Sequence, residues 1–134
     1  MRNSVEDNEQ ITLFRWRDLF VGKYPELKLM HHIPNGGSRD KREAAKLKRM
    51  GVKAGVCDIF LPVPKNGRHG LYIELKAGKN RLTAEQKEFI ADVGALGYKT
   101  AVCYGWEAAA AEILQYMSGK AVTVDDITRL GGAV

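Results

Sequence analysis

The chain has 134 residues, 45% hydrophobic and 28% charged, which are the proportions of one ordinary globular domain. No apolar run reaches the roughly 18–20 residues that span a bilayer, and the start of the chain is charged from Arg2 onward, so we expect neither a membrane segment nor a signal peptide. The formal net charge of +5 favours a polyanionic partner.

The two cysteines, Cys57 and Cys103, each lie inside an apolar run. Neither has the paired spacing of a zinc site or of a thioredoxin-type motif. We therefore expect two reduced thiols in the core of a protein that resides in a reducing, cytoplasmic environment.

A first helix is predicted over residues 5–21, because apolar residues recur there with helical spacing. Leu13, Trp16 and Phe20 stand at i, i+3 and i+7. Glu9 precedes Leu13 by four residues on the same stripe, so we expect it at one end of the buried face. Its carboxylate either complements the helix N-terminus or takes part in a site.

A short strand, a loop and a basic helix are predicted next, over residues 27–33, 34–38 and 39–50. His31 and His32 would face opposite sides of the strand, as packing or surface residues, or with one of them against phosphate. The loop could grip DNA through its backbone or be an ordinary turn. The helix could bind phosphates or be a solvated surface helix.

Two neighbouring strands are predicted over residues 56–61 and 71–76, joined by a turn-rich connection. Asp58 interrupts the apolar run of the first strand. In the second strand, alternation places the acid and the lysine of Glu74-Leu75-Lys76 on one face and turns the leucine into the core.

A helix is predicted over residues 83–96, because Thr83 and Gln86 stand at the spacing of a capping box and Gly97 suits the end of a helix. We expect its buried stripe to comprise Phe89, Ile90, Val93 and Leu96. The capping box alone accounts for Gln86, although a role in a site is also possible.

The predicted order of elements is α/β, with a small mixed β-sheet flanked by helices. A strand over residues 99–104 and a helix over 106–117 complete the core. We expect a single domain over residues 1–134, with a core at about 5–117 and a C-terminal tail at 118–134 for which no element is predicted.

Two acids in central strands, Asp58 and Glu74, are costly to bury unless they are paired or bound to a cation. Asp58 could simply be exposed near a strand end or paired with Lys76. Two carboxylates beside a lysine nevertheless suit a divalent cation and phosphodiester hydrolysis. Carboxylate oxygens bind a hard cation, which polarises phosphate, and a lysine can orient water or stabilise negative charge.

Several local motifs resemble the virus-type replication-repair nuclease (VRR-NUC) domain of the PD-(D/E)XK nuclease superfamily. They are Gly55-Val56-Cys57-Asp58, Glu74-Leu75-Lys76, and Arg81-Leu82-Thr83 followed by Gln86. The Pro34-Asn35-Gly36-Gly37 loop with Arg39, and the Gly97-Tyr98 step, resemble the compact stand-alone phage and bacterial members. The resemblance covers roughly residues 9–117 and implies a restriction-endonuclease-like core.

The resemblance implies a Mg²⁺ or Mn²⁺ site and assigns a role to each matching position. The implied metal ligands are Asp58, Glu74 and the main-chain carbonyl of Leu75, with Lys76 as the catalytic lysine, Gln86 as a supporting residue and Glu9 as the acid of the first helix. Cys57 departs from the family, which usually has proline before the aspartate. That change affects local geometry and removes no ligand.

The resemblance also implies a substrate and an assembly: branched DNA such as a Holliday junction, and a homodimer. The candidate DNA-binding residues are Asn35, Gly36, Arg39, Lys79 and Arg81. A non-catalytic nucleic-acid-binding module with the same fold is the alternative interpretation. A protein acting on small phosphorylated substrates is less favoured, because no GxxxxGK[ST] loop is present.

Overall fold

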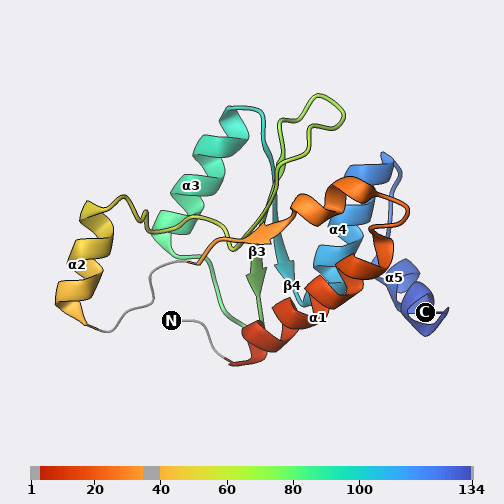
Figure 1. Ribbon diagram of the computed structural model, residues 1–134, viewed down its shortest axis with the longest axis horizontal. Helices are drawn as coiled ribbons and strands as arrows, with labels where there is room; N and C mark the ends of the chain where they lie inside the picture. Colours follow the sequence, from red (N-terminus) through yellow and green to blue (C-terminus); the bar gives the residue numbers. More distant parts are fainter. Residues whose placement is uncertain (1–3, 35–39, 134) are drawn as a thin grey trace.

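The computed structural model describes residues 4–34 and 40–133, except for the side chains of the last three of these. A four-stranded sheet with the order β1-β2-β3-β4 forms its centre, and helices lie on both sides of it (Figure 1). This arrangement confirms the predicted fold class, an α/β protein with a small mixed sheet flanked by helices.

The bounds of the strands and helices agree with most of the predicted segments. The strands are β1 (His31–His32), β2 (Ile59–Leu61), β3 (Leu71–Lys76) and β4 (Lys99–Tyr104). The helices are α1 (Ser4–Phe20), the 3₁₀ helix η1 (Pro25–Leu29), α2 (Lys41–Arg49), α3 (Ala84–Ala95), α4 (Trp106–Ser118) and α5 (Val124–Ala133). In the described ranges, 4–34 and 40–133, no helix is both long and apolar enough to cross a membrane.

The pairing of the strands brings two points that are distant in sequence to one end of the sheet. β1 and β2 pair antiparallel, as do β2 and β3, whereas β3 and β4 run parallel. Ile59 lies opposite Ile73, so the residue before β2 lies beside the C-terminal half of β3. A side chain at position 58 therefore meets the end of the strand that carries Glu74.

The main core lies on one face of the sheet, between β3 and the helices α1 and α4. Leu71, Ile73 and Leu75 alternate along β3 and are fully buried, as the predicted turn of Leu75 into the core requires. Leu13 of α1 and Ile113 of α4 pack in the same cluster and are also fully buried. Burial of each such side chain contributes about 1.5–3 kcal/mol. This energy holds the apolar face of β3 against the helices, so the polar residues of the strand lie on its other face.

The strand predicted over 27–33 is wrong in its first half, where the chain forms η1. Pro25 suits the first turn of a helix because it has no N–H to satisfy. Arg17 Nη1 of α1 donates to the carbonyls of Leu27 and Met30, both at 3.0 Å. Bonds from another helix therefore stabilise a turn that local periodicity did not predict.

Three other predictions need correction. β2 begins at Ile59, so Asp58 precedes the strand and does not lie within a strand over 56–61. The stripe predicted to be buried on α3 is not: Phe89, Ile90 and Val93 are only half-buried, and Leu96 is 69% exposed because it is the C-cap residue past the last helical turn. The segment 118–134 contains α5, whose fully buried Ile127 joins the main core, where α5 packs on α4.

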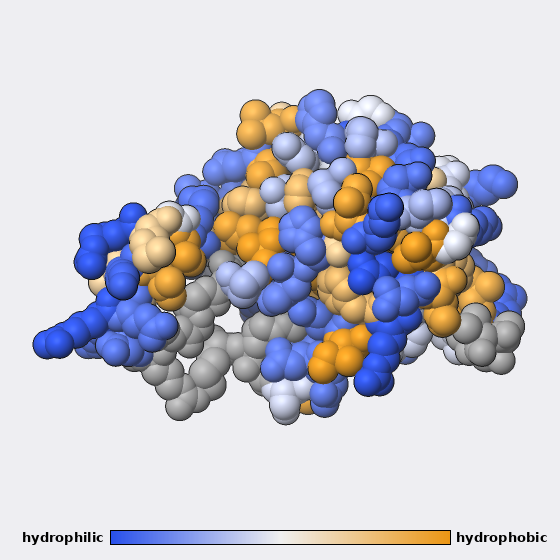
Figure 2. Space-filling view, viewed as in Figure 1, coloured by the Kyte–Doolittle hydropathy of each residue, from blue (hydrophilic) through white to orange (hydrophobic). Residues whose placement is uncertain are grey.

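Helix α2 stands apart from the sheet, at the left of Figure 1. None of its side chains is buried, and basic residues dominate it. Figure 2 accordingly shows hydrophilic side chains gathered over this helix. It begins at Asp40, whose carboxylate accepts from the backbone N–H of Arg42 at 2.9 Å.

Gly55 holds the segment before Asp58 close to the first turn of α3. Its φ is +89°, and a Cβ added there would lie 2.4 Å from the carbonyl oxygen of Glu85. We expect Gly55→Ala to lower the free energy of unfolding by about 2 kcal/mol or more, since both the backbone strain and the clash oppose folding. Urea denaturation measures this loss.

Gly51→Ala is the matched control, because Gly51 also has a positive φ (+103°) but has open space around it. It should show the conformational strain without the clash. Equal denaturation midpoints for the two variants would mean that the close approach to Glu85 contributes nothing.

Candidate active site

Asp58, Glu74 and Lys76 converge at one end of the sheet, on the face opposite the main core. Asp58 immediately precedes β2, Glu74 and Lys76 lie at the end of β3, and the three residues are 6%, 2% and 7% exposed, respectively. Three buried charges in one place are unfavourable unless each one has partners. The partners described below hold the group in a fixed geometry.

Asp58 is held from both neighbouring strands. Its Oδ2 accepts from the backbone N–H of Leu75 at 3.0 Å. Its carbonyl oxygen accepts from the N–H of Ile33 at 2.7 Å and from Nδ1–H of His32 at 2.8 Å. Sequence reasoning gave His32 no such role, because the contact depends on how β1 pairs with the chain before β2.

Glu74 is only partly satisfied by its neighbours. Its Oε2 accepts from Gln86 Nε2 at 3.1 Å and lies 3.5 Å from Lys76 Nζ. Its Oε1 is buried and has no hydrogen-bond partner among the described residues. Burial raises the pKa of Glu74 to about 8; the negative charge of Asp58 adds to this increase, and the Lys76 ammonium opposes it.

Gln86 reaches Glu74 because the start of α3 fixes its side chain. The predicted capping box is confirmed: Thr83 Oγ1 accepts from the N–H of Gln86 at 3.1 Å, and Gln86 Oε1 accepts from the N–H of Thr83 at 2.9 Å. The amide oxygen is thus used for the cap, and the amide nitrogen is directed at the carboxylate. The predicted supporting role of Gln86 remains a prediction.

Two acids of α1, Glu9 and Glu6, each have a hydrogen-bond partner of their own. Glu9 Oε2 accepts from the backbone N–H of Trp106 at 3.0 Å and so caps α4, and its predicted role beside a metal remains a prediction. Glu6 is the more buried acid, 6% exposed, and accepts from Asn80 Nδ2 at 2.6 Å. Its place seven residues before Leu13 was a signal for burial that could have singled it out.

The candidate DNA-binding residues divide into two groups. Lys79 and Arg81 are exposed in the loop between β3 and α3, directly after Lys76. Asn35, Gly36 and Arg39 lie outside the described residues.

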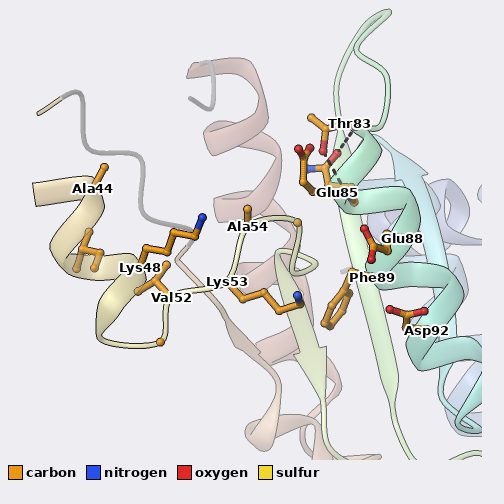
Figure 3. A pocket seen from close by; sticks show the side chains of 14 residues that line it. Ala44, Lys48, Val52, Lys53, Ala54, Thr83, Glu85, Glu88, Phe89 and Asp92 are labelled. Carbon is orange, nitrogen blue, oxygen red and sulfur yellow. Dashed lines mark hydrogen bonds between the residues drawn. The ribbon is translucent and has the colours of Figure 1, made fainter. Parts of the chain in front are cut away.

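A pocket of about 740 Å³ separates α2 from α3 and adjoins the site through Gln86, which lines it. Its walls carry opposite charges. The charged lining consists of Lys48 and Lys53 on the α2 side and Glu85, Glu88 and Asp92 on α3 (Figure 3). A polyanion would therefore be attracted to one wall of this pocket and repelled by the other.

Both cysteines are free thiols in the interior, as predicted. Cys57 is 1% exposed and Cys103 3%. Burial raises the pKa of each thiol to about 12, so both are protonated at neutral pH and unsuited to act as nucleophiles. Cys57 serves as a packing residue next to Asp58.

The donor set fits a hard divalent cation. Carboxylate oxygens are the ligands that Mg²⁺ and Mn²⁺ prefer, and the unpartnered Oε1 of Glu74 is an oxygen that such an ion would satisfy. Within residues 4–34 and 40–133, no three His, Cys, Asp or Glu side chains form a group suited to a metal. Further ligands would come from main-chain carbonyls or water, and the Leu75 carbonyl remains a predicted ligand.

Comparison with known proteins identifies the family and supports the fold. The family model of the VRR-NUC domain matches residues 10–107. A solved structure described as a VRR_NUC domain protein superposes with a TM-score of 0.72 at 31% sequence identity, and the match covers 92% of this chain and 97% of that chain. No curated protein matches the chain significantly.

Proposed function

The chain belongs to the VRR-NUC domain family, a family of nucleases, and we propose that it is a Mg²⁺- or Mn²⁺-dependent endonuclease that hydrolyses phosphodiester bonds of branched DNA. Asp58 and Glu74 would hold the cation, together with the carbonyl of Leu75. Lys76 would act on the attacking water or on the developing charge.

One observation carries the proposal: the Glu74 carboxylate is buried with one oxygen unpartnered. Gln86 Nε2 and Lys76 Nζ both contact Oε2, whereas Oε1 has no hydrogen-bond partner among the described residues. The raised pKa of Glu74 means that the site disfavours this negative charge as it stands. A cation would remove that penalty, so the arrangement favours a binding site over a static salt bridge.

The residues around this carboxylate have separate tasks. When bound, the cation would polarise a phosphate oxygen and make water a better nucleophile. Lys76 Nζ lies 3.5 Å from Glu74 Oε2, and its ammonium would orient that water or donate to negative charge developing on the phosphate. Gln86 restrains Glu74, and Leu75 N–H restrains Asp58. These bonds keep both carboxylates in position before substrate arrives.

The surface around the site supports DNA as the substrate. Lys79 and Arg81 are exposed beside it, and the chain carries a net charge of +5. We further propose a homodimer, which would place two such sites symmetrically for cutting both strands of a junction.

The direct test is a panel of labelled junction, flap, duplex and single-stranded DNA, incubated with the purified protein at one fixed salt concentration. We expect cleavage with Mg²⁺ or Mn²⁺, none with EDTA, and faster cleavage of the junction than of the duplex. Product sizes on denaturing gels give the cut position. Size-exclusion chromatography with light scattering measures the assembly.

A non-catalytic module would give a different set of results. It would bind the same DNA panel with no product under any metal condition. Equal cleavage of junction and duplex DNA would support a nuclease but contradict its proposed selectivity for branched DNA.

A further inference from the structure

A group of aromatic rings lies on the same face of the sheet as the buried carboxylates. Phe60 follows Asp58 by two residues and Tyr72 precedes Glu74 by two, so strand alternation puts all four on one face. We call the group the aromatic shelf. Its members are His31, Phe60, Tyr72, Tyr98, His69 and Phe89.

The rings of the shelf form one continuous set of contacts. Phe60 and Tyr72 are stacked, with centroids 4.3 Å apart and planes at 22°. Tyr72 meets Phe89 of α3 edge-on at 5.2 Å, and Phe60 meets His31 edge-on at 5.9 Å. Figure 3 shows Phe89 projecting from α3 at the pocket beside the site. The shelf therefore extends from β1 to α3 across the face that carries the carboxylates.

Phe60 is fixed in place and yet only half-buried. Its Cε1 lies 3.0 Å from where a Cβ on Gly70 would be, so the ring rests against glycine backbone, and a larger residue at position 70 would displace it. Tyr72 is also half-buried, and His31 is exposed. The alternating residues Ile59, Leu61 and Ile73 on the other face are fully buried. The shelf thus leaves part of a rigid aromatic surface open to solvent.

We propose that the aromatic shelf stacks on an unpaired nucleic-acid base next to the phosphate that is cut, a role that rests on the proposed nuclease function. Tyr72 stands two residues before Glu74, about 7 Å along the strand, which places the rings beside the catalytic group. Aromatic surfaces stack on any base whose face is free, and bases inside a duplex offer no free face.

This assignment defines the substrate class more narrowly than the carboxylates do. Carboxylates, a cation and a lysine act on any phosphodiester bond, whether its bases are paired or not. A shelf that needs an open base selects phosphates at the points of branched DNA where a base is unpaired, such as the start of a flap or an opened branch point of a junction.

The test measures binding in EDTA, so that it does not depend on cleavage. The probes are two fluorescently labelled strands of equal charge: a 12-mer of thymidine and a 12-mer of abasic sites. We expect the wild-type protein to bind the thymidine strand roughly tenfold more tightly, as one base–aromatic stack allows. Phe60→Leu should lose this difference while binding the abasic strand as the wild type does, and Phe60→Trp should keep it.

Phe20→Leu is the matched control, because Phe20 is also a half-buried ring, paired with Trp16 at a centroid distance of 4.7 Å on the opposite side of the molecule's core. It should bind both strands as the wild type does, so any general loss of stability appears equally in both leucine variants. The proposal is overturned if the wild type binds both strands equally, or if Phe60→Leu retains the difference. If the wild-type protein prefers the thymidine strand but cleaves no DNA in Mn²⁺, the base-stacking role of the shelf would stand and the proposed nuclease function would be rejected.

Discussion

Replacement of Lys76 by alanine is expected to reduce cleavage of labelled junction DNA by a factor of about 100 or more, with the protein still folded. The lysine is 7% exposed, and its ammonium lies 3.5 Å from Glu74 Oε2. In the proposed reaction the ammonium would contact the attacking water or the negatively charged phosphate. Single-turnover rates in Mg²⁺, with protein in excess over DNA, isolate this step. Asp58→Asn should lose activity to a similar extent, because the amide weakens cation binding.

Two controls separate lost chemistry from lost structure. Lys76→Met keeps most of the buried aliphatic stem and should be as inactive as the alanine variant. Lys87→Ala removes an exposed lysine of α3 and should cleave at the wild-type rate. Undiminished cleavage by Lys76→Ala or Asp58→Asn would show that the catalytic group lies elsewhere.

Replacement of Glu74 by glutamine should abolish cleavage and yet stabilise the metal-free protein at high pH. The pKa of Glu74 rises from its ordinary 4.5 to about 8 in the folded chain. Between pH 4.5 and 8 the folded protein holds a proton that the unfolded chain has released, so stability falls as the pH rises through this window. The whole loss is on the order of a few kcal/mol. Glutamine mimics the protonated acid and should remove this dependence.

Thermal melts in EDTA at pH 5, 7 and 9 measure the effect. The wild type and Glu74→Gln should melt at similar temperatures at pH 5, and the variant should melt higher at pH 9. Mn²⁺ should then raise the melting temperature of the wild type at pH 9 and leave that of the variant unchanged. Glu88→Gln, an exposed acid of α3, should follow the wild type throughout. Parallel pH curves for the wild type and Glu74→Gln would refute the unfavourable burial of this charge.

The fold could be predicted where local patterns and tertiary structure agree. β3 alternates between core and site, and α3 begins at a capping box, so both were located from sequence. The turn at Pro25 was missed because side-chain bonds from Arg17 stabilise it. For α5 a local signal did exist: Thr123 and Asp126 exchange hydrogen bonds at the start of that helix, at capping-box spacing.

The charged residues of the candidate site could be predicted from the sequence, but the hydrogen bonds that position them could not. Asp58, Glu74 and Lys76 can be singled out because charged residues interrupt apolar runs of the sequence, and the structure brings them together. The bond from His32 to the Asp58 carbonyl and the bond from Asn80 to Glu6 join segments far apart in sequence. Neither the periodicity nor the residue spacing of a single segment predicts such long-range contacts.

Helix α2 lies apart from the sheet, so the residues that determine stability and the basic residues that would attract a polyanion lie in different parts of the chain. The side chains that stabilise the domain lie in the main core, and α2 contributes no buried residue to it. Its lysines and arginines can therefore be added, removed or exchanged without opening a cavity or leaving a buried charge unpaired. Affinity for a polyanion and resistance to unfolding can thus vary independently in this molecule.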